Sequence, residues 1–147
     1  MPRGTEFASF VAGFVAGEGC FTLSGRPSSF RFAVGLGPVD SQICDELQAF
    51  FGVAHVTRSP RRRPHYDDEV CFAVRALPHL VNVIVPFMDE HLLPSYKRNQ
   101  YQAWRTTLLS YWEHQAKRVR GCTVEGCTAP RRARGLCRRH YYAAFRR

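Results

Sequence analysis

The stretch VAGFVAGEG, residues 11–19, decides how this chain folds. Apolar residues recur at helical spacing from Phe7 to Val15, so we predict a helix over residues 7–17. Four small residues lie three and four positions apart on it: Ala12, Gly13, Ala16 and Gly17. Side chains this small would allow a second backbone to approach closely. The predicted helix is followed directly by an acidic residue, Glu18.

Downstream of this stretch the pattern predicts an α+β domain. Strands are predicted over residues 20–24, 30–36, 53–58 and 69–75, where apolar and polar residues alternate. Helices are predicted from a capping Asp40 to the residue before Gly52, over residues 77–88, and after a capping Ser95. This order predicts one antiparallel sheet with helices on one face and the other face open.

The open face is the predicted surface for double-stranded DNA. We expect Arg31, Arg58 and Arg75 to lie on it, and the loop after the third strand adds Arg61, Arg62 and Arg63. A two-stranded ribbon fits the major groove of DNA, and arginine binds phosphate and guanine.

The charge of the chain is concentrated near its C-terminus. The 147 residues include 21 Lys and Arg and 12 Asp and Glu, a net charge of +9. Residues 117–147 carry ten of the basic residues and one acidic residue, so they account for the whole excess. A charge run is often only a solvated face, but it also suits a polyanionic partner.

Residues 11–19, together with the order of predicted elements, resemble the LAGLIDADG family of homing endonucleases over residues 6–115. The resemblance implies an αββαββα domain with a saddle-shaped sheet that cleaves a long, pseudo-palindromic DNA target by Mg²⁺-assisted phosphodiester hydrolysis. It implies that Glu18 and Gly19 bind Mg²⁺, and that Glu18 and Lys97 are the catalytic residues.

The motif occurs once, so the resemblance implies a homodimer whose interface is formed by Ala12, Gly13, Ala16 and Gly17. Two positions depart from the family. Ala16 stands where the family usually has an acid, and residues 34–37 (VGLG) hold no polar residue where the family often has one.

A separate zinc module is predicted over residues 118–147, after an endonuclease domain of residues 1–117. Its ligands are Cys122, Cys127, Cys137 and His140, a donor set typical of structural Zn²⁺. So short a segment cannot bury a sufficient core without a metal. We predict DNA contacts from its arginines: Arg131, Arg132, Arg134, Arg138 and Arg139.

The remaining three cysteines and the apolar residues 7–17 indicate the expected cellular location. Cys20, Cys44 and Cys71 are scattered among apolar residues, so we expect small core residues in a reducing, cytoplasmic protein. The apolar segment 7–17 is too short to span a bilayer, and no membrane association is expected.

Three alternatives stay open at this point. The first is a DNA-binding regulator that has lost cleavage, which the departures at Ala16 and residues 34–37 favour. The second is an RNA-splicing maturase, a role found among similar proteins. The third is a zinc-dependent interaction protein, which the charge distribution disfavours.

Overall fold

The computed structural model describes residues 4–25, 28–60, 68–117 and 121–145. The chain divides into two compact units, Met1–Leu109 and Ser110–Arg147, and each is described by itself. The division expected from the sequence, between residues 117 and 118, stays a prediction.

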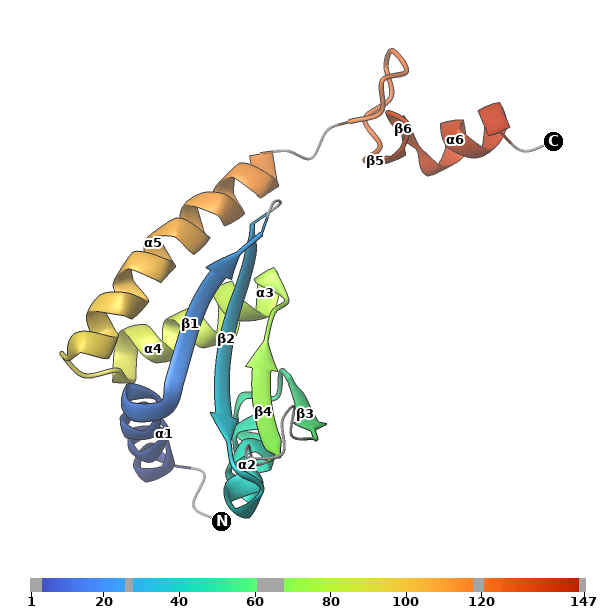
Figure 1. Cartoon of the computed structure of the whole chain (residues 1–147). Coiled ribbons are helices and arrows are strands. Elements are labelled where there is room, and N and C mark those ends of the chain that lie inside the picture. The colour runs from blue at the N-terminus through green and yellow to red at the C-terminus, as the bar shows by residue number, and fades with distance from the viewer. Residues whose placement is uncertain (1–3, 26–27, 61–67, 118–120, 146–147) are drawn as a thin grey trace. The chain divides into compact units, whose positions relative to one another are not determined.

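The first unit has the predicted order of elements (Figure 1). Its order is α1 (Thr5–Glu18), β1 (Gly19–Ser24), β2 (Ser29–Leu36), a 3-10 turn (Pro38–Asp40), α2 (Ser41–Phe51), β3 (His55–Ser59), β4 (Glu69–Val74), α3 (Leu77–His79), a π-helical segment (Leu80–Ile84), α4 (Val85–His91) and α5 (Tyr96–Lys117). The predicted helix of residues 77–88 is therefore three consecutive helical segments that end three residues later.

The four strands form one antiparallel sheet in the order β1-β2-β4-β3. Phe21 lies opposite Phe32 in neighbouring strands, and both side chains face the helices. Successive side chains in a strand alternate between faces, so Arg31 and Cys71 lie on the opposite face. The α+β class and the helix-free face are confirmed for the described residues.

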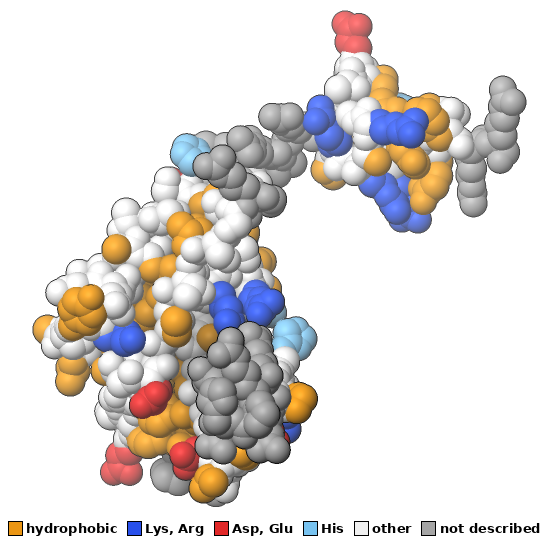
Figure 2. Space-filling view, viewed as in Figure 1, with side chains coloured by type: hydrophobic (Ala, Val, Ile, Leu, Met, Phe, Trp, Pro, Cys, Tyr) orange, Lys and Arg blue, Asp and Glu red, His pale blue; other side chains and the backbone are white. Residues whose placement is uncertain are grey.

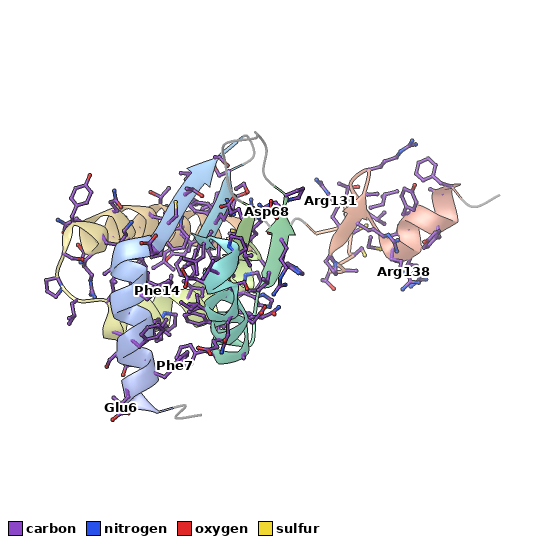
Figure 3. All side chains as sticks on the ribbon, turned by 60° about the horizontal axis from the view of Figure 1, so that its bottom comes forward. Glu6, Phe7, Phe14, Asp68, Arg131 and Arg138 are labelled. Atoms are coloured by element: carbon purple, nitrogen blue, oxygen red, sulfur yellow. The ribbon has the colours of Figure 1, made fainter. Side chains whose placement is uncertain are left out.

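Aromatic side chains bind the helices to the sheet. Phe51 of α2 packs against Phe72 with ring centroids 5.8 Å apart, and Phe21 of β1 packs 5.1 Å from Tyr101 of α5. On α1, the ring centroid of Phe7 lies 5.2 Å from that of Phe50 in α2. Figure 3 labels Phe7 on this helix. Burying a large apolar side chain contributes about 1.5–3 kcal/mol, so these contacts fix α1, α2 and α5 on one face of the sheet.

Two helix starts were predicted, and one has the predicted cap. The Ser95 hydroxyl oxygen accepts a hydrogen bond from the Arg98 amide at 3.1 Å, which confirms the cap of α5. Asp40 precedes α2, but its side chain makes no capping bond, so that prediction was wrong. Asp40 already belongs to the 3-10 turn that begins at Pro38.

The three scattered cysteines do not share one environment. Cys44 and Cys71 are buried, as predicted, but Cys20 is exposed. Strand alternation explains this error, because its neighbour Phe21 takes the inward position and turns Cys20 toward the open face. None of the helices in the described ranges is long and apolar enough to cross a membrane.

The second unit contains a short hairpin followed by a helix. Strands β5 (Arg131–Ala133) and β6 (Leu136–Cys137) are antiparallel, and α6 (Arg138–Phe145) follows directly. The Cys122 amide donates to the Ala129 carbonyl at 2.9 Å. Cys137, the last residue of β6, is buried.

Candidate functional site

The predicted motif forms a direct passage from helix to strand. Glu18 is the last residue of α1, and Gly19 is the first residue of β1. A Cβ atom at Gly19 would lie 2.6 Å from both the carbonyl oxygen and Cγ1 of Val15, so no larger residue fits here. This close approach leaves Glu18 exposed at the foot of α1.

Lys97 reaches this same junction from a distant part of the chain. Its Nζ donates a hydrogen bond to the Gly19 carbonyl oxygen at 2.6 Å, although the two residues are 78 positions apart. A second bond holds α5 along β1, because Trp104 Nε1 donates to the Thr22 carbonyl oxygen at 3.0 Å. The structure therefore places the predicted lysine beside the residue that follows Glu18.

The turn between α4 and α5 is held by polar contacts. Arg98 donates from its guanidinium to the carbonyl oxygens of Met88, Asp89 and Leu92, which end α4. The Asp89 carboxylate lies 2.8 Å from the Tyr101 hydroxyl and accepts from Arg105 Nε at 2.9 Å. Burial and the adjacent Asp89 raise the pKa of Tyr101, so its hydroxyl stays protonated. These contacts fix the N-terminal part of α5, which carries Lys97, against α4.

The four small residues of α1 differ in exposure, and the dimer interface expected from them stays a prediction. Ala12 is only 5% exposed, yet it lines a surface hollow together with Gly13 and Ala16. Gly13 and Gly17 are exposed, and Ala16 is half-buried. A Cβ at Gly13 or Gly17 would meet no atom of the described chain within 4 Å. The accessible strip therefore contains these two glycines and the 46%-exposed Phe10.

The open face of the sheet carries fewer cations than the sequence predicted. Arg31 lies on it half-buried, and its Nη2 donates to Cys71 Sγ at 3.0 Å. Its Nε is buried and has no hydrogen-bond partner among the described residues. Arg75 is exposed directly after β4. Arg61, Arg62 and Arg63 lie outside the described residues.

Arg58 was assigned to the wrong face. It lies opposite Val70, whose side chain is buried on the helix side of the sheet. Its Nη2 donates to both oxygens of Asp45 in α2, at 3.0 and 2.8 Å. The pairing register decides which face each strand residue occupies. The strand was predicted to begin at residue 53 but begins at His55, and the sequence pattern did not define its register.

One carboxylate on the open face, that of Glu69, was not predicted from the sequence. Oε1 of Glu69, in β4, lies 2.6 Å from where a Cβ of Gly35 would be. Gly35 belongs to residues 34–37, where no polar residue was found, so the neighbouring strand supplies a polar group there. A glycine inside a strand often marks such a close approach, and that signal could have indicated it.

The second unit brings the four predicted zinc ligands together. Their ligand atoms all lie within 4.8 Å of one another. Nδ1 of His140 lies 3.2 Å from Cys122 Sγ and 3.4 Å from Cys137 Sγ, and the Cys127 and Cys137 sulfurs are 3.9 Å apart. Zinc bonds of about 2.3 Å to sulfur and 2.0–2.1 Å to nitrogen give similar separations in a tetrahedron, so the geometry fits Zn²⁺.

The protonation of these thiols also suits a cation. Desolvation opposes ionisation of Cys122, but hydrogen bonds from the amides of Cys137 and Val124 and from His140 outweigh it and lower its pKa to about 6. The Ala129 amide lowers the pKa of Cys127, yet desolvation and the neighbouring cysteines raise it more. Thiolates this close repel, so ionising all three requires a positive ion between them.

Comparison with known proteins adds the family. Residues 11–108 match the LAGLIDADG endonuclease family. The protein named "Probable intron-encoded endonuclease 2" from Neurospora crassa is 29% identical over 96 residues, which are 63% of this chain and 20% of that protein. This chain therefore spans about a fifth of the length of that relative.

Solved structures agree with the fold. The homing endonuclease I-TnaI has a TM-score of 0.62 and 26% identity, over 74% of this chain and 75% of that one. I-GzeII, a LAGLIDADG homing endonuclease solved in complex with its DNA target, has a TM-score of 0.65 and 21% identity, over 74% of this chain and 37% of that one. The helix-to-strand junction with Lys97 beside it, and the match over residues 11–108, lead to one conclusion: this chain belongs to the LAGLIDADG endonuclease family.

Proposed function

We propose that this protein is a site-specific endonuclease that cuts double-stranded DNA as a homodimer. The observation that carries the proposal is the hydrogen bond from Lys97 to Gly19, because it brings the two predicted catalytic residues to one junction. Lys97 bonds to the backbone of the residue directly after Glu18, so the ammonium group and the carboxylate belong to the same junction. The target would be long and pseudo-palindromic, since two identical chains bind two related half-sites.

Glu18 would hold the catalytic Mg²⁺. Its carboxylate is exposed and accepts no hydrogen bond from any other described residue, and Mg²⁺ prefers such oxygen ligands. The Gly19 carbonyl, the second proposed ligand, already accepts from Lys97, so it offers its remaining lone pair. When bound, Mg²⁺ polarises the scissile phosphate and activates a water.

Lys97 would stabilise the negative charge that develops on the phosphate. Its ammonium group is held at the junction through Gly19, so little reorganisation is needed during the reaction. The bond uses one of its three N–H donors and leaves two for phosphate oxygens.

DNA would lie on the open face of the sheet. I-GzeII, which shares this fold, was solved with its DNA target. On this chain, Arg31 and Arg75 are the described cations proposed to contact DNA from that side, with Arg61, Arg62 and Arg63 as further candidates.

The partner chain would pack on the accessible strip of α1. Gly13 and Gly17 are exposed, and the space beside them is open, so a second α1 could approach closely. Two such chains would place their Glu18 residues on either side of one symmetry axis.

The second unit would be a structural zinc module that extends the DNA contact. Four protein ligands fill a tetrahedral site and leave no position for catalysis. Its three thiols would stay reduced in the cytoplasm, which is the proposed location. Lys and Arg side chains gather on this unit (Figure 2), which suits a phosphate backbone.

A second candidate is a DNA-binding regulator without cleavage. Ala16 favours it, because this position carries no acid two residues before Glu18. The retained Glu18 and Lys97 favour the nuclease.

Replacing Glu18 tests the catalytic assignment. Wild type should produce site-specific double-strand cuts in a randomised duplex library with Mg²⁺. Glu18→Gln should lower the cutting rate at least about a thousandfold, because the metal-binding charge is lost, and should keep DNA affinity. Uncut DNA with wild type would support the regulator, and full cutting by Glu18→Gln would remove this residue from the mechanism.

Filling the accessible strip tests the dimer. A Cβ at position 13 meets no atom of the described chain within 4 Å, and leucine favours a helix more than glycine does. The Gly13→Leu chain should therefore be at least as stable against unfolding as the wild-type chain. It should block the partner helix and shift sedimentation from two chains to one. Ala103→Leu, on an exposed part of α5, is the matched control. A Gly13→Leu protein that still sediments as a dimer would exclude this interface.

Zinc binding should depend on pH. The raised pKa of Cys127 means that a proton must leave when the metal binds, so affinity should rise with pH. Because the pKa of Cys122 is lowered to about 6, proton release from this thiol makes zinc affinity depend on pH only below about pH 6. We expect at least about a tenfold loss of affinity per unit from pH 8 to pH 7, measured against a competing chelator. Affinity that is independent of pH, or unchanged by Cys137→Ser, would contradict a thiolate site.

Removing the zinc module should weaken the salt dependence of DNA binding. Each phosphate contact contributes about 0.9 to the slope of log affinity against log salt. A chain lacking residues 118–147 should lose about 2 or more from that slope while it still cuts its target. An unchanged slope would show that this module makes no phosphate contacts.

A further inference from the structure

The hairpin of the second unit contains an arginine at an unfavourable position. Ala133 pairs with Leu136, so Arg134 and Gly135 form a two-residue loop. Both residues have left-handed backbone, with φ of +50° and +83°. Such loops favour Asn, Asp or Gly at the first position, and another residue there costs about 1–2 kcal/mol. Backbone conformation alone therefore does not explain Arg134.

Packing within the unit does fix the loop. The Thr123 amide donates to the Gly135 carbonyl oxygen at 2.9 Å. A Cβ at Gly135 would lie 3.2 Å from Thr123 Cγ2, so the loop sits tightly against this residue. The left-handed turn is thus imposed by its surroundings, and the side chain of Arg134 projects from a fixed backbone.

The guanidinium group of Arg134 lies over an aromatic ring in solvent. Its Cζ is 4.7 Å from the ring centroid of Phe145, which is 51% exposed, and Cζ of Arg132 lies 5.5 Å from the ring of Tyr142, which is 36% exposed. An exposed cation–π contact contributes about 0.5–1 kcal/mol. That gain does not exceed the cost of the left-handed backbone, so stacking within the chain does not account for Arg134 either.

A cation–π contact restricts a guanidinium without using its N–H groups as hydrogen-bond donors. Those N–H groups can still match two phosphate oxygens. Because the ring restricts the side chain beforehand, less entropy is lost on binding. Residues 117–147 carry a net charge of +9, so an anionic partner is favoured.

We propose that Arg134, held over the ring of Phe145, and Arg132, held over the ring of Tyr142, are preorganised contacts to the DNA phosphate backbone. This inference rests on the proposed DNA-binding function. The left-handed backbone of Arg134 would lower the stability of the fold while its side chain raises the affinity for DNA. Strained residues often occur at binding sites for this reason.

Arg134→Asn separates the two effects, because asparagine suits the left-handed position but cannot bind phosphate bidentately. The full-length variant should keep wild-type zinc affinity and equal or higher resistance to unfolding. Its affinity for the target duplex should fall about fivefold at 0.15 M salt, and the salt slope should fall by about 0.9 for each chain bound. Arg134→Gly, which also relieves the backbone, should give the same result.

Phe145→Leu is the matched variant for the stacking. It keeps the arginine and should therefore keep the salt slope, while affinity falls about two- to threefold because the guanidinium is no longer preorganised. Combined with Arg134→Asn, it should have no further effect on DNA affinity.

Three outcomes would overturn the inference. If wild type binds and cuts DNA but Arg134→Asn and Arg134→Gly bind with unchanged affinity and slope, the inference fails and the proposed function stands. If both variants lose zinc affinity or stability, Arg134 is structural. If wild type binds no duplex and only captures a protein partner, the proposed function fails and the inference fails with it.

Discussion

The close approach of Gly19 to Val15 is the constraint on which the proposed site depends. With no Cβ in the way, α1 passes into β1 without a loop, and Glu18 is left at the helix foot. The same passage turns the Gly19 carbonyl toward Lys97, which joins the end of the first helix to the start of the last. A bulkier residue would push β1 away from α1, and both groups would lose their common position.

The basic excess and the proposed catalytic residues lie in different parts of this chain. Residues 1–116 have no net charge, and the basic excess belongs to residues 117–147. In the first unit, Arg31 is held by Cys71 and Arg58 is neutralised by Asp45, so neither is a freely solvated cation. Under the proposed function, salt-sensitive affinity would come mainly from the second unit, and the sheet would contribute shape and base contacts.

The misplaced faces of Cys20 and Arg58 have one physical cause. The face that a strand residue occupies depends on the exact position and pairing of its strand, which residue type does not define. Glu69 was missed because it reaches over Gly35 from a neighbouring strand, and strand order cannot be read from local patterns. Alternation and helical period give two faces, but the pairing register decides which face each residue occupies.

By itself, the sequence determined the order of the elements in the first unit, the residues of the helix-to-strand motif and the four residues of the Cys3His cluster. Local physics is sufficient there, because periodicity, turn residues and ligand spacing act over short distances. Only the tertiary structure decided that Lys97 bonds to Gly19, that Ala12 is buried, and that Arg132 and Arg134 lie over aromatic rings. Those contacts join residues from different elements, and their geometry exists only after the elements have packed.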